Sequence, residues 1–206
     1  MKKILVSLIT VASLASAGGC LLVQSDEMNV TWEGYKTLDK VAVSGQFTAV
    51  DYVPNKKEGK NFKELLVGSK VSIALNKINT HNEERDKTLL TNFFEKFTVK
   101  TIEGEILSMK ADPKEKGKRV YHGVIDVNVS MNGTAVVVPM KYNYEKENFT
   151  AKGTINLFAF KAEEAFNTLH ESCSKLHKGV TWAEVGIGFS TTIKATLCAA
   201  TIEKKK

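Results

Sequence analysis

Alternation of apolar and polar residues is the feature of this chain that most constrains its fold. In "VGIGFSTTIKATL" (residues 185–197) the odd positions are mostly apolar, and the even positions are glycine, serine, threonine and lysine. Successive side chains of a β-strand point to opposite faces of the sheet, so the pattern predicts a long strand with one buried face. The segment "VIDVNVSM" repeats the pattern, and further strands are predicted at 29–36, 41–50, 69–78, 97–109 and 148–160.

Turns and two helical segments complete the pattern. Asn132-Gly133 stands between two β-rich runs and predicts a hairpin, because both turn residues need positive φ. Apolar residues recur at helical spacing over 81–97 and 161–179, with Gly179 as the expected C-cap. Together these elements predict one all-β domain, an antiparallel β-barrel of about eight strands with one or two short helical inserts.

The first residues are organised like a signal peptide. Two lysines precede the apolar run "ILVSLITVASL", which is too short to span a bilayer, and "ASA" fits a cleavage site. We expect a signal peptide at 1–17, cleavage between Ala17 and Gly18, and export of residues 18–206 as a single domain. The alternative is lipidation of Cys20, because "AGGC" is an imperfect lipoprotein box.

The charge balance argues against nucleic acid as a partner. The formal net charge is +6, and loss of the two lysines of the signal peptide lowers it by 2, to +4. No basic stripe interleaved with aromatic residues remains, so a nucleic-acid-binding footprint is not supported. The remaining charge favours at most a weak, transient contact with anionic membrane surfaces.

Three cysteines in an exported chain leave the disulfide pairing open. Cys20 precedes the first predicted strand and Cys198 follows the last apolar residue of the final strand. The two cysteines meet at one end of the barrel if these strands pair antiparallel. Cys173 with Cys198 is the rival pairing, and an exported protein permits either.

The charged stretch "INTHNEERDKTLLTNFF" (78–94) is a candidate for chemistry. His81 and Glu84 offer acid–base groups, but no nucleophile, phosphate loop or metal-ligand triplet stands beside them. We expect instead that Arg85 and Asp86 form an ion pair at the barrel mouth. Below that pair we expect an apolar lid formed by Leu89, Phe93 and Phe94.

A second cluster suggests metal binding only weakly. His170, Cys173 and His177 share one face of the later helical segment, at a spacing that suits zinc or copper. Cys173 also belongs to the apolar stripe of that segment, where a buried thiol is ordinary. We therefore predict no metal site.

The order of several motifs resembles the YceI-like family. "INTHNEERDKTLLTNFF" is similar to the family signature, an Ile-Asp-Thr-type strand end followed by Arg-Asp, a leucine and a Phe-Phe pair. Gly45 and Phe47 stand in place of its Gly-x-Phe, and "HGVIDVNVSMNGTAVVVPM" and "AKGTINL" resemble its later strands. Leu157 departs from the family pattern, where many relatives have a basic residue. The resemblance covers nearly all of the mature chain.

The resemblance implies a periplasmic, lipocalin-like barrel that binds a polyisoprenoid or similar long-chain amphiphile in its interior, for carriage or storage. It implies no catalysis and no cofactor other than the bound lipid, and it leaves the oligomeric state open, a dimer included. The residues expected to line the ligand are Trp32, Phe47, Ile73, Leu75, Arg85, Asp86, Leu89, Phe93, Phe94, Ile125, Val127, Phe189 and Ile193.

The apolar strand faces also fit a barrel that its own side chains fill, as in many small barrels. A ligand-free structural or envelope interaction barrel is therefore the main alternative. An enzyme acting on an amphiphile is the third.

Overall fold

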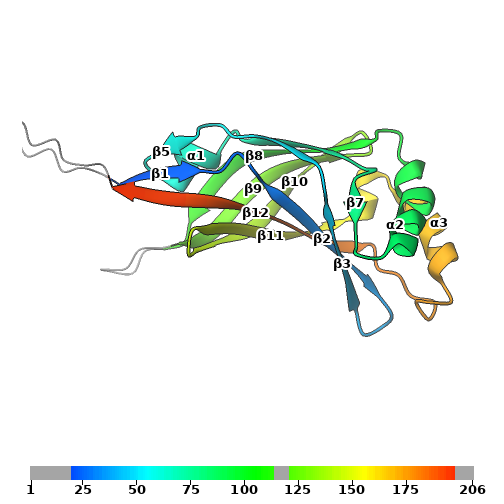
Figure 1. Ribbon diagram of the computed structural model, residues 1–206. Coiled ribbons are helices and arrows are strands. Elements are labelled where there is room, and N and C mark those ends of the chain that lie inside the picture. Colours follow the sequence, from blue (N-terminus) through cyan, green and yellow to red (C-terminus); the bar gives the residue numbers. More distant parts are fainter. Residues whose placement is uncertain (1–19, 114–120, 198–206) are drawn as a thin grey trace, which may run out of the picture.

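The computed structural model describes residues 20–113 and 121–197, which form one antiparallel sheet of twelve strands. The sheet curls round as expected for a lipocalin-like barrel, with helices gathered at its two ends (Figure 1). It contains twelve strands, several of them short, where about eight were expected. The predicted signal peptide, its cleavage site and Cys198 lie outside the described residues.

The strands are β1 (Cys20–Gln24), β2 (Asn29–Lys36), β3 (Val41–Phe47), β4 (Val50–Val53), β5 (Glu58–Gly59), β6 (Lys70–Ala74), β7 (Ile78–Asn79), β8 (Thr101–Ala111), β9 (His122–Met131), β10 (Thr134–Glu145), β11 (Asn148–Asn156) and β12 (Glu184–Leu197). The helices are α1 (Phe62–Leu66), α2 (Glu83–Asn92) and α3 (Glu163–Cys173), with 3₁₀ turns η1 (Phe94–Lys96) and η2 (Leu157–Phe160).

Hydrogen bonds connect the strands in the order β4-β6-β8-β9-β10-β11-β12-β2-β3-β7, and β1 pairs with both β12 and β5. Only two residues separate β3 from β4, so a bend in one continuous stretch of chain connects the two sides of the sheet. The first and last strands, β1 and β12, pair antiparallel with Cys20 opposite Leu197, which is the condition that the sequence analysis set for Cys20 and Cys198 to meet.

The hairpin and the alternation of faces are confirmed. Asn132 and Gly133 have φ values of 51° and 76° and connect Met131 to its partner Thr134. In β9 every second residue is buried, including Ile125.

Three predicted strands end earlier than expected. The predicted strand 41–50 ends as β3 at Phe47, and two residues separate it from β4. The run 69–78 breaks after Ala74, whose carbonyl accepts a turn hydrogen bond from Lys77 N at 3.1 Å, so that β7 pairs with β3 instead. The predicted strand 148–160 ends at Asn156, whose side chain accepts a hydrogen bond from Phe158 N at 2.9 Å. This local bond favours the 3₁₀ turn η2 over a continued strand.

Both predicted helical segments are confirmed, but the expected C-cap is wrong. The helix α3 ends at Cys173, well before Gly179. Gly179, with φ +75°, lies in the following turn and donates its N–H to Ser174 O at 2.8 Å.

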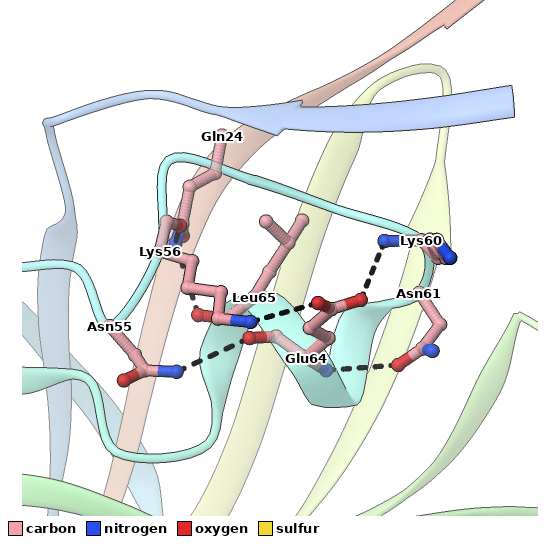
Figure 2. A network of polar contacts seen from close by, with 7 residues as sticks. All are labelled: Gln24, Asn55, Lys56, Lys60, Asn61, Glu64 and Leu65. Carbon is pink, nitrogen blue, oxygen red and sulfur yellow. Dashed lines mark hydrogen bonds and ion pairs between the residues drawn. The ribbon is translucent and has the colours of Figure 1, made fainter.

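The short helix α1, which the sequence analysis missed, closes one end of the barrel. The side chain of the N-cap residue Asn61 accepts from Glu64 N at 2.9 Å, and the Glu64 carboxylate accepts from the N–H of Lys60, the residue before the cap, at 2.9 Å (Figure 2). This arrangement is a variant of the capping box. Hydrogen bonds from the Lys56 ammonium and the Lys60 amide hold the pKa of Glu64 below its ordinary value. Leu65 and Leu66 of α1 are fully buried.

A buried polar side chain and an aromatic stack anchor this closed end. Gln24 is 4% exposed, and its amide donates to Lys56 O and to Leu65 O (Figure 2). Its carbonyl accepts from the hydroxyl of Tyr52. Beside it, Phe62 of α1 contacts Phe149 at a ring distance of 5.6 Å. The stack continues to Tyr142, Tyr144 and Phe189. This half of the barrel interior is therefore filled by side chains.

Candidate functional site

A cavity of about 680 Å³ occupies the opposite half of the barrel, under α2 and α3. Its walls come from β2, β3, α2, α3 and the inner face of β12, and none of its lining residues belongs to α1 or β1. Exposed residues of the wall, which mark the mouth, include Asn82, Glu84, Ser172 and Leu176. The cavity therefore opens between the start of α2 and the end of α3.

The floor of the cavity is the indole ring of Trp32. A Cβ placed on Gly45 would lie 2.4 Å from Cζ2 of this ring, whereas a Cβ on Gly34 would keep 3.6 Å from Cζ3. The ring therefore lies flat over Gly45, which pairs with Trp32 across β2 and β3. The indole N–H is buried and has no hydrogen-bond partner among the described residues. Such an unpaired donor is costly, because it has left water without a replacement acceptor.

Aromatic side chains at the junction of α2 and η1 form another part of the cavity wall. Phe94 contacts Phe93 and Phe47 at ring distances of 5.1 and 6.3 Å. Phe93 and Phe94 are buried, and Leu89 of α2 lines the cavity beside them. This side of the cavity can offer only apolar contact to a ligand.

Polar groups concentrate at the mouth. Nδ1 of His170 and Nδ1 of His177 lie 3.1 and 3.0 Å from the hydroxyl oxygen of Thr181. Burial, together with the positive charges of Lys36 and His170, lowers the pKa of His177 from its ordinary value. Lys36 and Arg85 also line the cavity, so cationic groups stand near its opening.

The predicted ion pair between Arg85 and Asp86 is wrong, since no such pair forms within the described residues. Asp86 turns toward the preceding loop, where its Oδ1 accepts from Thr80 N at 2.9 Å and from the Thr80 hydroxyl at 2.6 Å. Adjacent helical residues point in different directions, and Arg85 alone faces the cavity. His81 is exposed, outside the cavity wall.

The structure divides the expected ligand-lining residues into two groups. Six lie in the cavity wall: Trp32, Phe47, Arg85, Leu89, Phe93 and Phe94. The other seven lie outside the wall: Ile73, Leu75, Asp86, Ile125, Val127, Phe189 and Ile193. Asp86 faces the loop before α2, and the six apolar side chains pack against other side chains in the filled part of the interior.

Sequence reasoning missed the contribution of α3 and the turn after it. Phe166, Leu169 and Trp182 line the cavity, although they were assigned to a helical stripe or to no element. The apolar stripe of α3 was visible in the sequence, but nothing in the sequence indicated which element it covers.

Cys173 is a free, buried thiol in the cavity wall, so its proposed pairing with Cys198 is not formed. The helix α3, of which Cys173 is the last residue, lies at the opposite end of the barrel from the end of β12 (Figure 1). No group of three or more His, Cys, Asp or Glu side chains in the described part of the chain is arranged to hold a metal ion. Within residues 20–113 and 121–197, no helix has the length and hydropathy that a membrane span requires.

Comparison with solved structures supports the fold. The chain is similar to a polyisoprenoid binding domain from Saccharophagus degradans implicated in plant cell wall breakdown, with 13% identity, a TM-score of 0.53, and coverage of 85% of this chain and 98% of that one. It is also similar to BcnA from Burkholderia cenocepacia, with 14% identity, a TM-score of 0.53, and coverage of 81% and 96%. A search of curated proteins finds no match to the chain.

The family model for the YceI-like domain matches residues 22–197, from β1 to the end of β12. That match spans the whole curled sheet, the closed end and the cavity. The chain therefore belongs to the YceI-like domain family.

Proposed function

We propose that this protein binds a polyisoprenoid or similar long-chain amphiphile in the cavity under α2 and α3. The observation that carries the proposal is an apolar cavity of about 680 Å³ that is closed at one end and open at the other. Pockets for small ligands commonly have volumes of roughly 300–1,000 Å³ and mostly apolar walls. The structural similarity to a polyisoprenoid binding domain supports the same class of ligand.

The size of the cavity limits the length of the bound chain. A water molecule takes up about 30 Å³ in the liquid and a methylene group roughly as much, so the cavity has space for on the order of 20 chain carbons. The apolar part would contact Trp32, Phe47 and Phe94, and a polar head would lie near Lys36 and Arg85. Binding is driven by removal of apolar surface from water, roughly 25 cal/mol per Å² before ordering costs.

The proposed setting is the periplasm, after removal of residues 1–17. The lysines and apolar run at the start of the chain support export. In that compartment the protein would carry or store the amphiphile without chemical change. The mass of the protein isolated from its own cell envelope tests this directly, because cleavage before Gly18 and acylation of Cys20 give different masses.

Native mass spectrometry of the same material, followed by organic extraction, tests the ligand. We expect a stoichiometric extra mass that resolves to a prenyl or fatty chain. A protein that carries no extra mass and takes up no added isoprenoid would overturn the proposal and favour the ligand-free barrel.

A matched pair of variants locates the binding site. Leu169→Trp places a large ring in the cavity wall, whereas Val137→Trp adds the same ring on β10, where Val137 is 53% exposed. We expect Leu169→Trp to lower the affinity for a fluorescent prenyl analogue by about tenfold or more, because it removes ligand volume. Equal affinities in the two variants would place the ligand elsewhere.

A further inference from the structure

The two most exposed large apolar side chains of the described residues lie at the same end of the molecule. Leu38, in the turn between β2 and β3, is 80% exposed, and Leu176, in the turn after α3, is 77% exposed. Figure 1 shows the hairpin tip and the turn after α3 projecting together beyond the helices. We call residues 36–40 and 174–180 the paired turns.

Hydrogen bonds hold the paired turns against each other. Thr37 N donates to Val180 O at 3.2 Å, and the indole of Trp182 donates to Thr37 O at 2.8 Å. Lys40 covers the Trp182 ring at 4.3 Å and forms an ion pair with Glu184 at 2.6 Å. The two leucines are therefore presented by one connected surface.

The positive charge of the paired turns favours an anionic partner. The paired turns carry four lysines and a single acidic residue, Asp39. Lys175 and Lys178 are exposed on either side of Leu176. Exposed leucines flanked by lysines match the surface of an anionic bilayer, where apolar side chains enter the interface and ammonium groups contact phosphates.

We propose that the paired turns dock this protein on anionic lipid membranes. Leu176 and His177 also belong to the cavity wall, so docking would place the cavity mouth against the bilayer. Glu83 and Glu84 stand on α2, the other boundary of the mouth, and like-charge repulsion would tilt this helix away from the lipid. Given the proposed lipid ligand, an apolar chain could then pass between bilayer and cavity with little contact with water.

Flotation with vesicles tests the docking surface without reference to any ligand. Purified protein is mixed with vesicles of phosphatidylethanolamine and phosphatidylglycerol, or with vesicles of phosphatidylcholine alone. We expect binding to the anionic vesicles only, and weaker binding at high salt because salt screens the lysines. Failure of the wild-type protein to float with anionic vesicles would overturn the proposal.

Three variants identify the residues. Leu38→Ser should lower the partition coefficient about fivefold or more, since it removes an inserted apolar side chain. The double charge reversal Lys175→Glu/Lys178→Glu should lower it at least about tenfold. Val53→Ser is the matched control, because Val53 is 64% exposed on β4, away from the paired turns. Flotation of Leu38→Ser at the wild-type level would also overturn the proposal.

Uptake of a soluble fluorescent prenyl analogue, measured without vesicles, separates this inference from the proposed function. Leu38 is not part of the cavity wall, so Leu38→Ser should retain uptake while losing flotation. A wild-type protein that floats but takes up no analogue would refute the ligand and leave the docking surface in place.

Discussion

Gly45 and the indole ring of Trp32 allow a direct test of how the cavity floor is built. In Gly45→Ala the new Cβ would lie 2.4 Å from Cζ2, 2.5 Å from Cε2 and 2.8 Å from Nε1 of Trp32. The ring is rigid, so it must leave its position over β3. Forced displacement of a packed side chain costs about 1–3 kcal/mol. We expect Gly45→Ala to lower the free energy of unfolding by that amount.

Gly34→Ala is the matched control on the same floor. Its Cβ would keep 3.6 Å from the same ring, an ordinary contact. Both substitutions restrict the unfolded chain similarly, by about 0.4–1 kcal/mol, so this effect cancels in the comparison. Urea unfolding should therefore separate the two variants by about 1–3 kcal/mol, and melting temperatures by roughly 2–4 °C for each kcal/mol.

Two further results complete the test. In a Trp32→Leu background the cost of Gly45→Ala should largely disappear, because the clashing ring is gone. Gly45→Ala should also weaken binding of the prenyl analogue, since the displaced ring enters the cavity. Equal stabilities of Gly45→Ala and Gly34→Ala would refute the described contact between Trp32 and Gly45.

Two other variants probe a hydrogen bond at the start of α2 and a histidine of the cavity wall. Asp86→Ala should lower the free energy of unfolding by about 1–3 kcal/mol in urea titrations, because Thr80, 6% exposed, loses the acceptor for its amide and hydroxyl. The control Lys87→Ala, at an exposed neighbouring position, should stay within about 0.5 kcal/mol of the wild type. An Asp86→Ala variant as stable as the wild type would contradict this role of Asp86. Folding lowers the pKa of His177 from its ordinary value of 6.5. As the pH falls, the unfolded chain therefore binds more protons at this residue than the folded protein does. The loss of folding free energy caused by His177 is absent above about pH 6.5 and grows as the pH falls through that value. It levels off once the pH is below the folded-state pKa of His177. Unfolding of His177→Asn at several pH values should show a flatter decline below pH 6.5 than the wild type; parallel curves would exclude this contribution.

The barrel could be predicted from the sequence because period-two alternation is a local property of each strand. The hairpin at Asn132-Gly133 was readable for the same reason, since two adjacent residues determine the turn. The breaks after Ala74 and Asn156 were not, because each depends on a single turn or side-chain hydrogen bond that competes with the strand.

The closed end and the position of the cavity required the tertiary structure. "NFKE" at 61–64 has the spacing of a capping box and could have indicated α1, although a helix this short has little periodicity of its own. Ile125 and Phe94 are both apolar and both buried, yet only Phe94 lines the cavity. Which apolar residues surround empty space depends on how α1 and its aromatic neighbours fill the far half, and alternation carries no information about that.

The helix α1 and the aromatic side chains packed beside it close the far end of the barrel, so the cavity is a blind pocket and not a through channel. A chain that enters tail first must therefore leave head first, by the same opening. For the proposed lipid ligand, loading and unloading would retrace one path, so the protein would not thread a chain from one side of itself to the other or invert its direction. A chain longer than the pocket would extend out of the mouth, at the surface where an acceptor could contact it.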